Sequence, residues 1–126
     1  MKINHIALWA KDIEKMRDFY EKYFQAKSND KYINEKKGFQ SYFLSFQSGC
    51  RLEIMHSEKT RKEQPAAALG LCHLAFSLGS KEAVDEMTEK LMADGYSKID
   101  GPRTTGDGYY ESVFLDPEGN KIELTV

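Results

Sequence analysis

Two histidines and two glutamates occupy matching positions in the two halves of this chain. His5 and His73 each enter an alternating apolar segment near the start of a half, and Glu53 and Glu123 lie in alternating segments near its end. A neutral imidazole nitrogen and a carboxylate oxygen are both good donors for divalent first-row ions. These residue types at these positions make the four side chains candidate ligands of a metal ion.

The elements that must position these residues form an internal repeat. The segment 4–9 aligns with 72–77, and each is followed by an N-cap residue, Asp12 or Ser80, and then by apolar residues at helical spacing. Gly95 is placed to end the second helix, whereas the first ends near Gln25 without a glycine. The expected order in each half is β-α-β-β-β, with later strands at 31–35, 42–46 and 51–55 in the first half and at 97–99, 109–115 and 121–125 in the second.

Strand alternation predicts which way the four candidate ligands point. Because successive strand side chains face opposite sides, Leu52 and Ile54 face one way and Glu53 the other. The large aliphatic face must cover the helices, so each half places one histidine and one glutamate on its concave, helix-free face. Two such halves together would supply four donors to one ion and leave two octahedral positions for water or a bidentate substrate.

A more ordinary interpretation stands beside this hypothesis. A single histidine on a strand is usually a hydrogen-bonded structural residue, and a single strand glutamate is usually solvated. The matched occurrence of both types in both halves favours metal ligation, although a duplicated scaffold could retain this symmetry without a metal. The third histidine, His56, falls on the aliphatic side of its strand and is interpreted as a non-ligand.

Composition excludes several classes of function. The chain has 126 residues, 18 basic and 20 acidic, with a formal net charge of −2, so the basic excess typical of nucleic-acid binding is absent. No apolar run approaches the roughly 20 residues that a membrane span needs, and a strand pattern begins at once, without a signal-peptide core. We expect a cytoplasmic protein with a small-molecule substrate and no nucleic-acid or membrane partner. The expected organisation is one domain over 1–126: module one at 1–56, a linker at 57–70 and module two at 71–126.

The chain resembles the vicinal-oxygen-chelate superfamily, which includes glyoxalase I, bleomycin-resistance proteins and extradiol dioxygenases. The resemblance is strongest in 4–7, 70–76 and 116–124, and it extends over essentially the whole chain. It implies an α+β fold in which two βαβββ modules form a cupped, open mixed β-barrel with the helices outside. It also implies a divalent ion (Zn, Ni, Mn, Co or Fe) on His5, Glu53, His73 and Glu123, and a homodimer whose sites lie within one chain or between two.

The metal set resembles that of glyoxalase I, because that enzyme carries a glutamate where Glu53 stands. The substrate positions do not resemble it: Trp9 replaces the arginine that helps to hold glutathione, and Ser57 replaces an asparagine. Trp9 suits an apolar or aromatic ligand, or else packs in the wall of the cavity. Further candidate substrate-binding residues are Arg51, Arg103, Tyr109 and Lys121. The glycine-containing stretch 104–108 is interpreted as a flap or as a polar hairpin loop.

The predicted function is that of a metal-dependent lyase or isomerase, similar to lactoylglutathione lyase. It would abstract a proton from a small α-hydroxycarbonyl-like substrate with vicinal oxygens and stabilise the resulting enediolate. Glu53 and Glu123 are the candidate general bases, and the sequence does not distinguish them. The alternatives are a metal-free small-molecule binding or resistance protein, and a thiol transferase or dioxygenase on the same scaffold.

Overall fold

The computed structural model describes residues 2–59, 70–106 and 108–126. The chain divides into two compact units, residues 1–64 and 65–126. Most of the predicted linker, 57–70, lies outside the described residues. Its first residue, Ser57, is the last residue of a strand.

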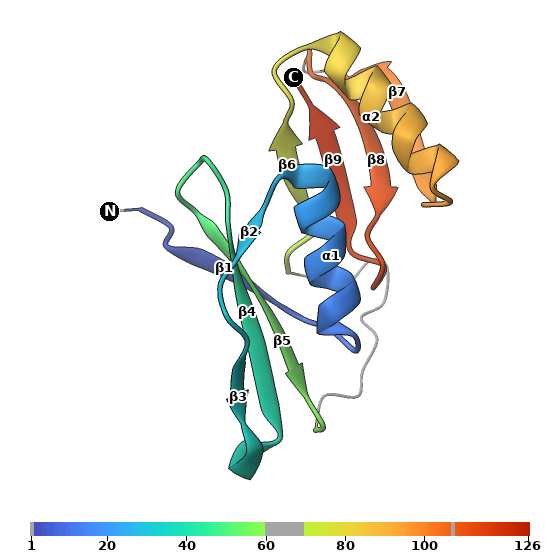
Figure 1. The fold of residues 1–126 in the computed structure, drawn as a ribbon. Coiled ribbons are helices and arrows are strands. Elements are labelled where there is room, and N and C mark those ends of the chain that lie inside the picture. The colour runs from blue at the N-terminus through green and yellow to red at the C-terminus, as the bar shows by residue number, and fades with distance from the viewer. Residues whose placement is uncertain (1, 60–69, 107) are drawn as a thin grey trace. The chain divides into compact units, whose positions relative to one another are not determined.

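The first unit is a five-stranded mixed sheet with one long helix (Figure 1). Its strands are ordered β1-β5-β4-β2, and β3 also pairs with β4. Strands β1 and β5 are parallel, whereas the pairs made by β4 are antiparallel. The elements are β1 (His5–Trp9), α1 (Ile13–Phe24), β2 (Lys27–Ser28), β3 (Tyr32–Asn34), the short 3₁₀ helix η1 (Glu35–Lys37), β4 (Phe39–Ser45) and β5 (Arg51–Ser57).

The second unit repeats this plan with four strands in the order β6-β9-β8-β7. Again the first and last strands are parallel neighbours and the other pairs are antiparallel. Figure 1 shows α2 running alongside β8 and β7. The elements are β6 (His73–Ser77), α2 (Lys81–Ala93), β7 (Lys98–Thr104), β8 (Tyr110–Leu115) and β9 (Lys121–Thr125).

Both helices begin at the residues that the sequence indicates. The Asp12 side chain accepts a hydrogen bond from the Lys15 amide at 2.9 Å, and the Ser80 hydroxyl accepts one from the Ala83 amide at 3.1 Å. Each side chain thereby satisfies a backbone donor that has no partner within its helix. Gly95 follows α2 at φ 86°, the left-handed conformation that favours glycine.

The core of each unit lies between its helix and one face of its sheet. In the first unit the buried apolar strand residues are Tyr42, Leu44, Leu52 and Ile54, and in the second they include Phe114, Ile122 and Leu124. Fully burying one such aliphatic or aromatic side chain contributes about 1.5–3 kcal/mol. This burial fixes the register, because a slip of one residue would expose the whole apolar set.

The predicted α+β class with a β-α-β-β-β repeat is therefore confirmed, with two differences in detail. The first unit contains an additional two-residue strand, β2, and β7 extends well beyond the predicted 97–99. The nine described strands form two separate sheets, and among described residues no hydrogen-bonded ladder closes them into one barrel.

Strand β7 carries a bulge at Gly101. The register with β8 shifts on both sides of Asp100, and Gly101 has φ 77°. A Cβ atom at this position would stand 2.4 Å from the carbonyl oxygen of Glu111. Glycine is required here both for its backbone conformation and for the close approach of β7 to β8.

Candidate metal centre

In the first unit, His5 and Glu53 lie on neighbouring parallel strands and share the face without the helix. The Nε2 atom of His5 is 3.9 Å from Oε2 of Glu53, and their side chains are 41% and 15% exposed. Glu53 is paired with Ala7 on one side and with Phe43 on the other, so on the β1 side only a methyl group stands beside the carboxylate. The two side chains share one face, as strand alternation predicts, and their role as metal ligands stays a prediction.

The second unit reproduces the pair with a different imidazole atom. The Nδ1 atom of His73 is 3.3 Å from Oε1 of Glu123, with side chains 39% and 20% exposed. Ala75 is paired opposite Glu123, as Ala7 is opposite Glu53. Each unit therefore presents one imidazole and one carboxylate on a partly open surface.

These separations are compatible with two ligands of one ion. Two donors about 2.1 Å from an ion lie about 3.0 Å apart at 90° and about 3.4 Å apart at the tetrahedral angle. The pair in the second unit matches this range, and the pair in the first exceeds it by about 0.5 Å, which a small side-chain rotation removes. In residues 2–59, 70–106 and 108–126, no cluster of three or more His, Cys, Asp or Glu is arranged to hold a metal.

A hydrogen-bonded group surrounds His5. Nδ1 of His5 lies 3.0 Å from Oδ1 of Asn4, and the same oxygen accepts a hydrogen bond from Nη2 of Arg51 at 2.8 Å. The Arg51 guanidinium lies over the Phe43 ring at 4.4 Å from its centroid, and the His5 ring meets Phe43 edge-to-face at 5.3 Å. Arg51, a predicted substrate-binding residue, is thus linked to His5 through the Asn4 oxygen and the Phe43 ring.

The other end of the same face is aromatic. Trp9 is 50% exposed and makes an edge-to-face contact with Phe39 at 6.3 Å between centroids. Phe39 also contacts Tyr32, which is 52% exposed. The first unit therefore has an exposed face that is polar near His5 and aromatic near Trp9.

Arg103, a further predicted binding residue, is held by carboxylates on the face that carries Glu123. Its Nε donates to Asp100 at 2.7 Å, and its Nη2 lies 3.5 Å from Oε1 of Glu111. The hydrogen bond to Asp100 raises the pKa of Arg103, and the negative charges of Glu111 and Glu123 add to that shift. The same bond lowers the pKa of Asp100.

The last two predicted binding residues are placed differently from each other. Lys121 is half-buried and paired with His73, so it lies on the face of the donor pair. Tyr109 is 55% exposed, and its backbone is bonded to Thr105 in the hairpin loop between β7 and β8. The structure brings Lys121 to the His73–Glu123 face and leaves Tyr109 at the loop.

Sequence reasoning did not identify two residues of these faces. Asn4 precedes its strand, so alternation gives its side chain no direction, and its role becomes visible only through its bonds to His5 and Arg51. Glu111 could have been found, because along the predicted strand it alternates with Ser112 and Phe114, which face the helix. Its pairing opposite Thr125 puts it on the Glu123 face.

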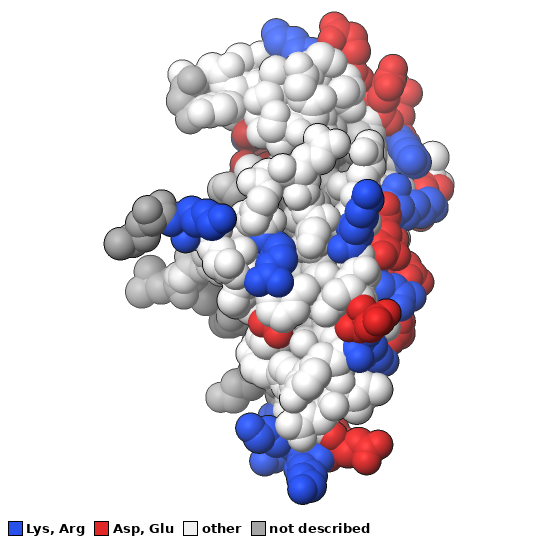
Figure 2. All heavy atoms as spheres, turned by 60° about the vertical axis from the view of Figure 1, so that its left-hand side comes forward, with Lys and Arg blue, Asp and Glu red and all other residues white. Residues whose placement is uncertain are grey.

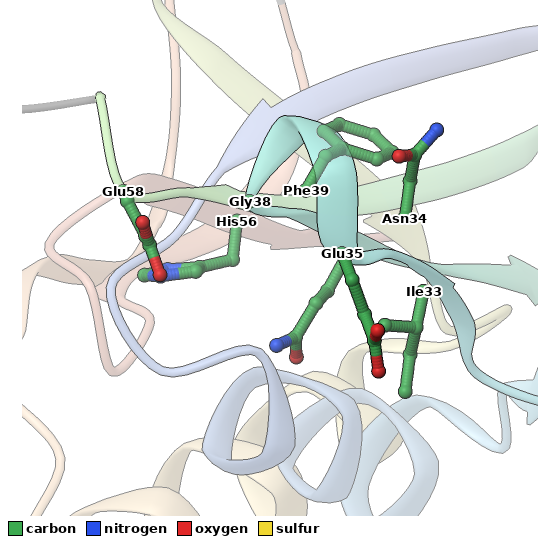
Figure 3. A pocket seen from close by; sticks show the side chains of 8 residues that line it. Ile33, Asn34, Glu35, Gly38, Phe39, His56 and Glu58 are labelled. Atoms are coloured by element: carbon green, nitrogen blue, oxygen red, sulfur yellow. The ribbon is translucent and has the colours of Figure 1, made fainter.

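A polar hollow of about 240 Å³ lies at the end of the first unit (Figure 3). Its lining includes His56, Gln40 and Ile33, which belong to the helix-covered side of the sheet by their pairing. Nδ1 of His56 is 3.0 Å from the Ala10 carbonyl oxygen and must donate to it. His56 is therefore a hydrogen-bonded residue on the face opposite the donor pair, in agreement with its interpretation as a non-ligand.

The surface shown in Figure 2 carries acidic and basic side chains side by side, together with a large uncharged area. This mixture fits the formal net charge of −2. Among the helices that the structure describes, none has the length and apolar character needed to cross a bilayer.

Comparison with known proteins identifies the family of this chain. The family model of the Glyoxalase/Bleomycin resistance protein/Dioxygenase superfamily matches residues 2–124. The chain belongs to this superfamily. It is 32% identical to the uncharacterized protein YqjT of Bacillus subtilis (strain 168), over 97% of this chain and 96% of that protein.

Solved structures agree with this assignment. A possible glyoxalase from Bacillus cereus matches with a TM-score of 0.75 and 25% identity, over 100% of this chain and 99% of the other. Glyoxalase I from Zea mays matches with a TM-score of 0.81 and 19% identity, over 98% of this chain and 44% of that one. The second likeness concerns the fold alone.

Proposed function

We propose that this protein is a divalent-metal-dependent lyase or isomerase of the glyoxalase I-like type. The observation that carries the proposal is the repeated donor pair: His5 with Glu53 at 3.9 Å, and His73 with Glu123 at 3.3 Å. Both pairs lie on helix-free sheet faces, with an alanine opposite each glutamate. The proposal requires the two pairs to bind one ion, either within a chain or between the two chains of a dimer.

The reaction that suits this donor set is a proton shift next to a carbonyl group. A divalent ion would act there as a Lewis acid and would make the C–H beside a carbonyl group more acidic; the residues that would hold it are His5, Glu53, His73 and Glu123. Glu53 or Glu123 then accepts that proton and returns it to the neighbouring carbon. Each carboxylate is suited to this role because it is partly shielded from water, with the Glu53 and Glu123 side chains 15% and 20% exposed.

The rest of the first face suggests the remainder of the substrate. From His5 to Trp9 a strand advances about 13 Å, at roughly 3.3 Å per residue. The exposed rings of Trp9 and Tyr32 at that distance suit an apolar or aromatic group. Arg51 and Arg103 are already engaged with Asn4, Asp100 and Glu111, so neither is an isolated anchor for a substrate carboxylate.

Metal content of the untagged protein tests the proposal directly. We expect one divalent ion for each His2Glu2 set, and a reduction of at least 10-fold in metal affinity in Glu53→Gln and in Glu123→Gln. Glu89→Gln, on the exposed side of α2, is the matched control and should bind metal like the wild type. Equal metal affinity in all three variants would refute the metal set.

Turnover with a panel of α-hydroxycarbonyl compounds tests the chemistry separately. On a substrate that the wild type converts, Glu53→Gln or Glu123→Gln should lose at least 100-fold in kcat, because general-base catalysis contributes about 10²–10⁴-fold. Full activity of both variants would remove the base role.

A metal-free binding protein is the second candidate, favoured by the exposed aromatic rings of Trp9 and Tyr32. It predicts ligand affinity that is unchanged by a chelator.

A further inference from the structure

The two candidate imidazole ligands are not supported in the same way. His5 is flanked by Asn4 and paired with Arg51, whereas the equivalent neighbours of His73 are Cys72 and Lys121. The repeat therefore breaks at Asn4, which contacts the ring of His5, and at Arg51, which donates to the same Asn4 oxygen. This difference has a direct effect on which nitrogen of that ring carries a proton.

The direction of the hydrogen bonds follows from donor and acceptor chemistry. A guanidinium can only donate, so the Asn4 side-chain atom that Arg51 contacts at 2.8 Å must be its oxygen. That same oxygen lies 3.0 Å from Nδ1 of His5, which must then be the donor. A neutral His5 consequently carries its proton on Nδ1 and keeps the lone pair of Nε2, the nitrogen that faces Glu53.

Packing holds this arrangement in place. The Arg51 guanidinium lies over the Phe43 ring, and the same ring meets His5 edge-to-face. Phe43 is itself paired across the sheet with Glu53. The Arg51 cation therefore keeps the Asn4 amide from turning. The edge-to-face contact with Phe43 orients the His5 imidazole.

We propose that Asn4 and Arg51 are positioning residues that fix His5 in the Nδ1–H tautomer and present Nε2 for metal binding. At His73 the corresponding residues are Cys72 and Lys121, and its Nδ1 lies instead 3.3 Å from Oε1 of Glu123. Only the role of the tautomer in metal binding rests on the proposed function. The tautomer itself is a property of the protein before any metal is added.

Imidazole ¹⁵N shifts of the metal-free protein, measured at a pH where the rings are neutral, test the inference. In the wild type, Nδ1 of His5 should show the shift of a protonated nitrogen and Nε2 that of an unprotonated one. Asn4→Ala should move both shifts towards the averaged values of a free imidazole, and Asn4→Asp should restore them because aspartate also accepts. His56, whose Nδ1 donates to Ala10, is an internal reference that should not change.

Arg51→Met tests whether the Arg51 cation decides which way the Asn4 amide points, because the variant keeps the amide and removes only the cation. Without the cation, the Asn4 amide can turn and offer its NH2 group to Nδ1, so the His5 proton should move to Nε2 in part of the population. Unchanged His5 shifts in both Asn4→Ala and Arg51→Met would overturn the inference.

Zn²⁺ titration followed by calorimetry then tests the purpose of the tautomer. We expect Asn4→Ala to weaken binding about 10-fold and Asn4→Asp to restore it, as for other residues that orient a ligand. A wild type that binds no Zn²⁺ yet shows the Nδ1–H shifts would refute the proposed function and leave the tautomer assignment standing. Tight binding by the wild type and Asn4→Ala alike would refute the positioning role.

Discussion

Replacement of Gly101 by alanine tests the close contact between β7 and β8. Gly101 has φ 77°, and an added Cβ would lie 2.4 Å from the Glu111 carbonyl oxygen and 2.9 Å from Cα of Ser112. Both contacts are with the backbone, so no flexible side chain can move aside. The strands would have to separate by about 1 Å to reach an ordinary contact distance, and Arg103 would shift with respect to Glu111.

The expected cost has two parts. The left-handed backbone conformation costs an alanine about 1–2 kcal/mol relative to glycine, and overpacking of this kind costs about 1–3 kcal/mol more. Gly101→Ala should therefore lower the free energy of unfolding by about 2–5 kcal/mol. Gly95→Ala is the matched control, because Gly95 also has positive φ (86°) but an added Cβ would meet nothing within 4 Å. It should lose only the first part, about 1–2 kcal/mol.

Urea denaturation followed by far-UV circular dichroism measures both variants against the wild type. The comparison holds where the slope of the free energy against urea is unchanged, since a changed slope would indicate a different denatured or native state. We expect Gly101→Ala to be less stable than Gly95→Ala by about 1–3 kcal/mol. If the two variants have equal midpoints, the close approach of β7 to β8 at Gly101 is wrong.

Two further predictions concern stability. The Thr88 hydroxyl donates to the Val84 carbonyl at 2.7 Å and must therefore accept from the Ser112 hydroxyl at 2.6 Å. Thr88→Val should leave this buried Ser112 donor without its acceptor, which should lower the free energy of unfolding by about 1–3 kcal/mol. Thermal unfolding should show Thr88→Val to be less stable than the double variant with Ser112→Ala, and the reverse order would contradict the assigned donor. The hydrogen bond from Lys31 lowers the pKa of Glu14 below its ordinary 4.5, so the unfolded chain binds more protons near that pH and stability should fall as the pH drops below about 4.5. Glu14→Gln should reduce this loss, by less than about 1 kcal/mol because the pair is partly exposed, and an unchanged acid profile would refute the assignment.

The sequence predicts the framework of the fold well because that framework depends on local signals. Asp12 and Ser80 are polar residues before apolar helical patterns, and both cap their helices. Alternation in the closing strands places Glu53 and Glu123 on the face opposite the buried aliphatic residues. These features need only the residue order and the periods of helix and strand.

The remaining features depend on contacts between residues distant in sequence. Nothing near Asn4 indicates that Arg51 will fix its amide, because that contact exists only once the first and last strands of the unit pair. The length of β7 is not apparent either, since Gly101 and the following proline interrupt its strand pattern and β8 supplies the pairing. Thr88 lies within a helix as a polar residue, and its partner Ser112 comes from a strand.

The parallel pairing of the first and last strands has a consequence for the history of the molecule. Because β1 pairs with β5 and β6 with β9, each half carries its imidazole and its carboxylate on adjoining strands, whatever follows it along the polypeptide. A gene segment that encodes one half can therefore be copied, fused or exchanged without dividing a donor pair. Differences between the halves, such as Asn4 before His5 and Cys72 before His73, can then arise in one copy while the other stays unaltered.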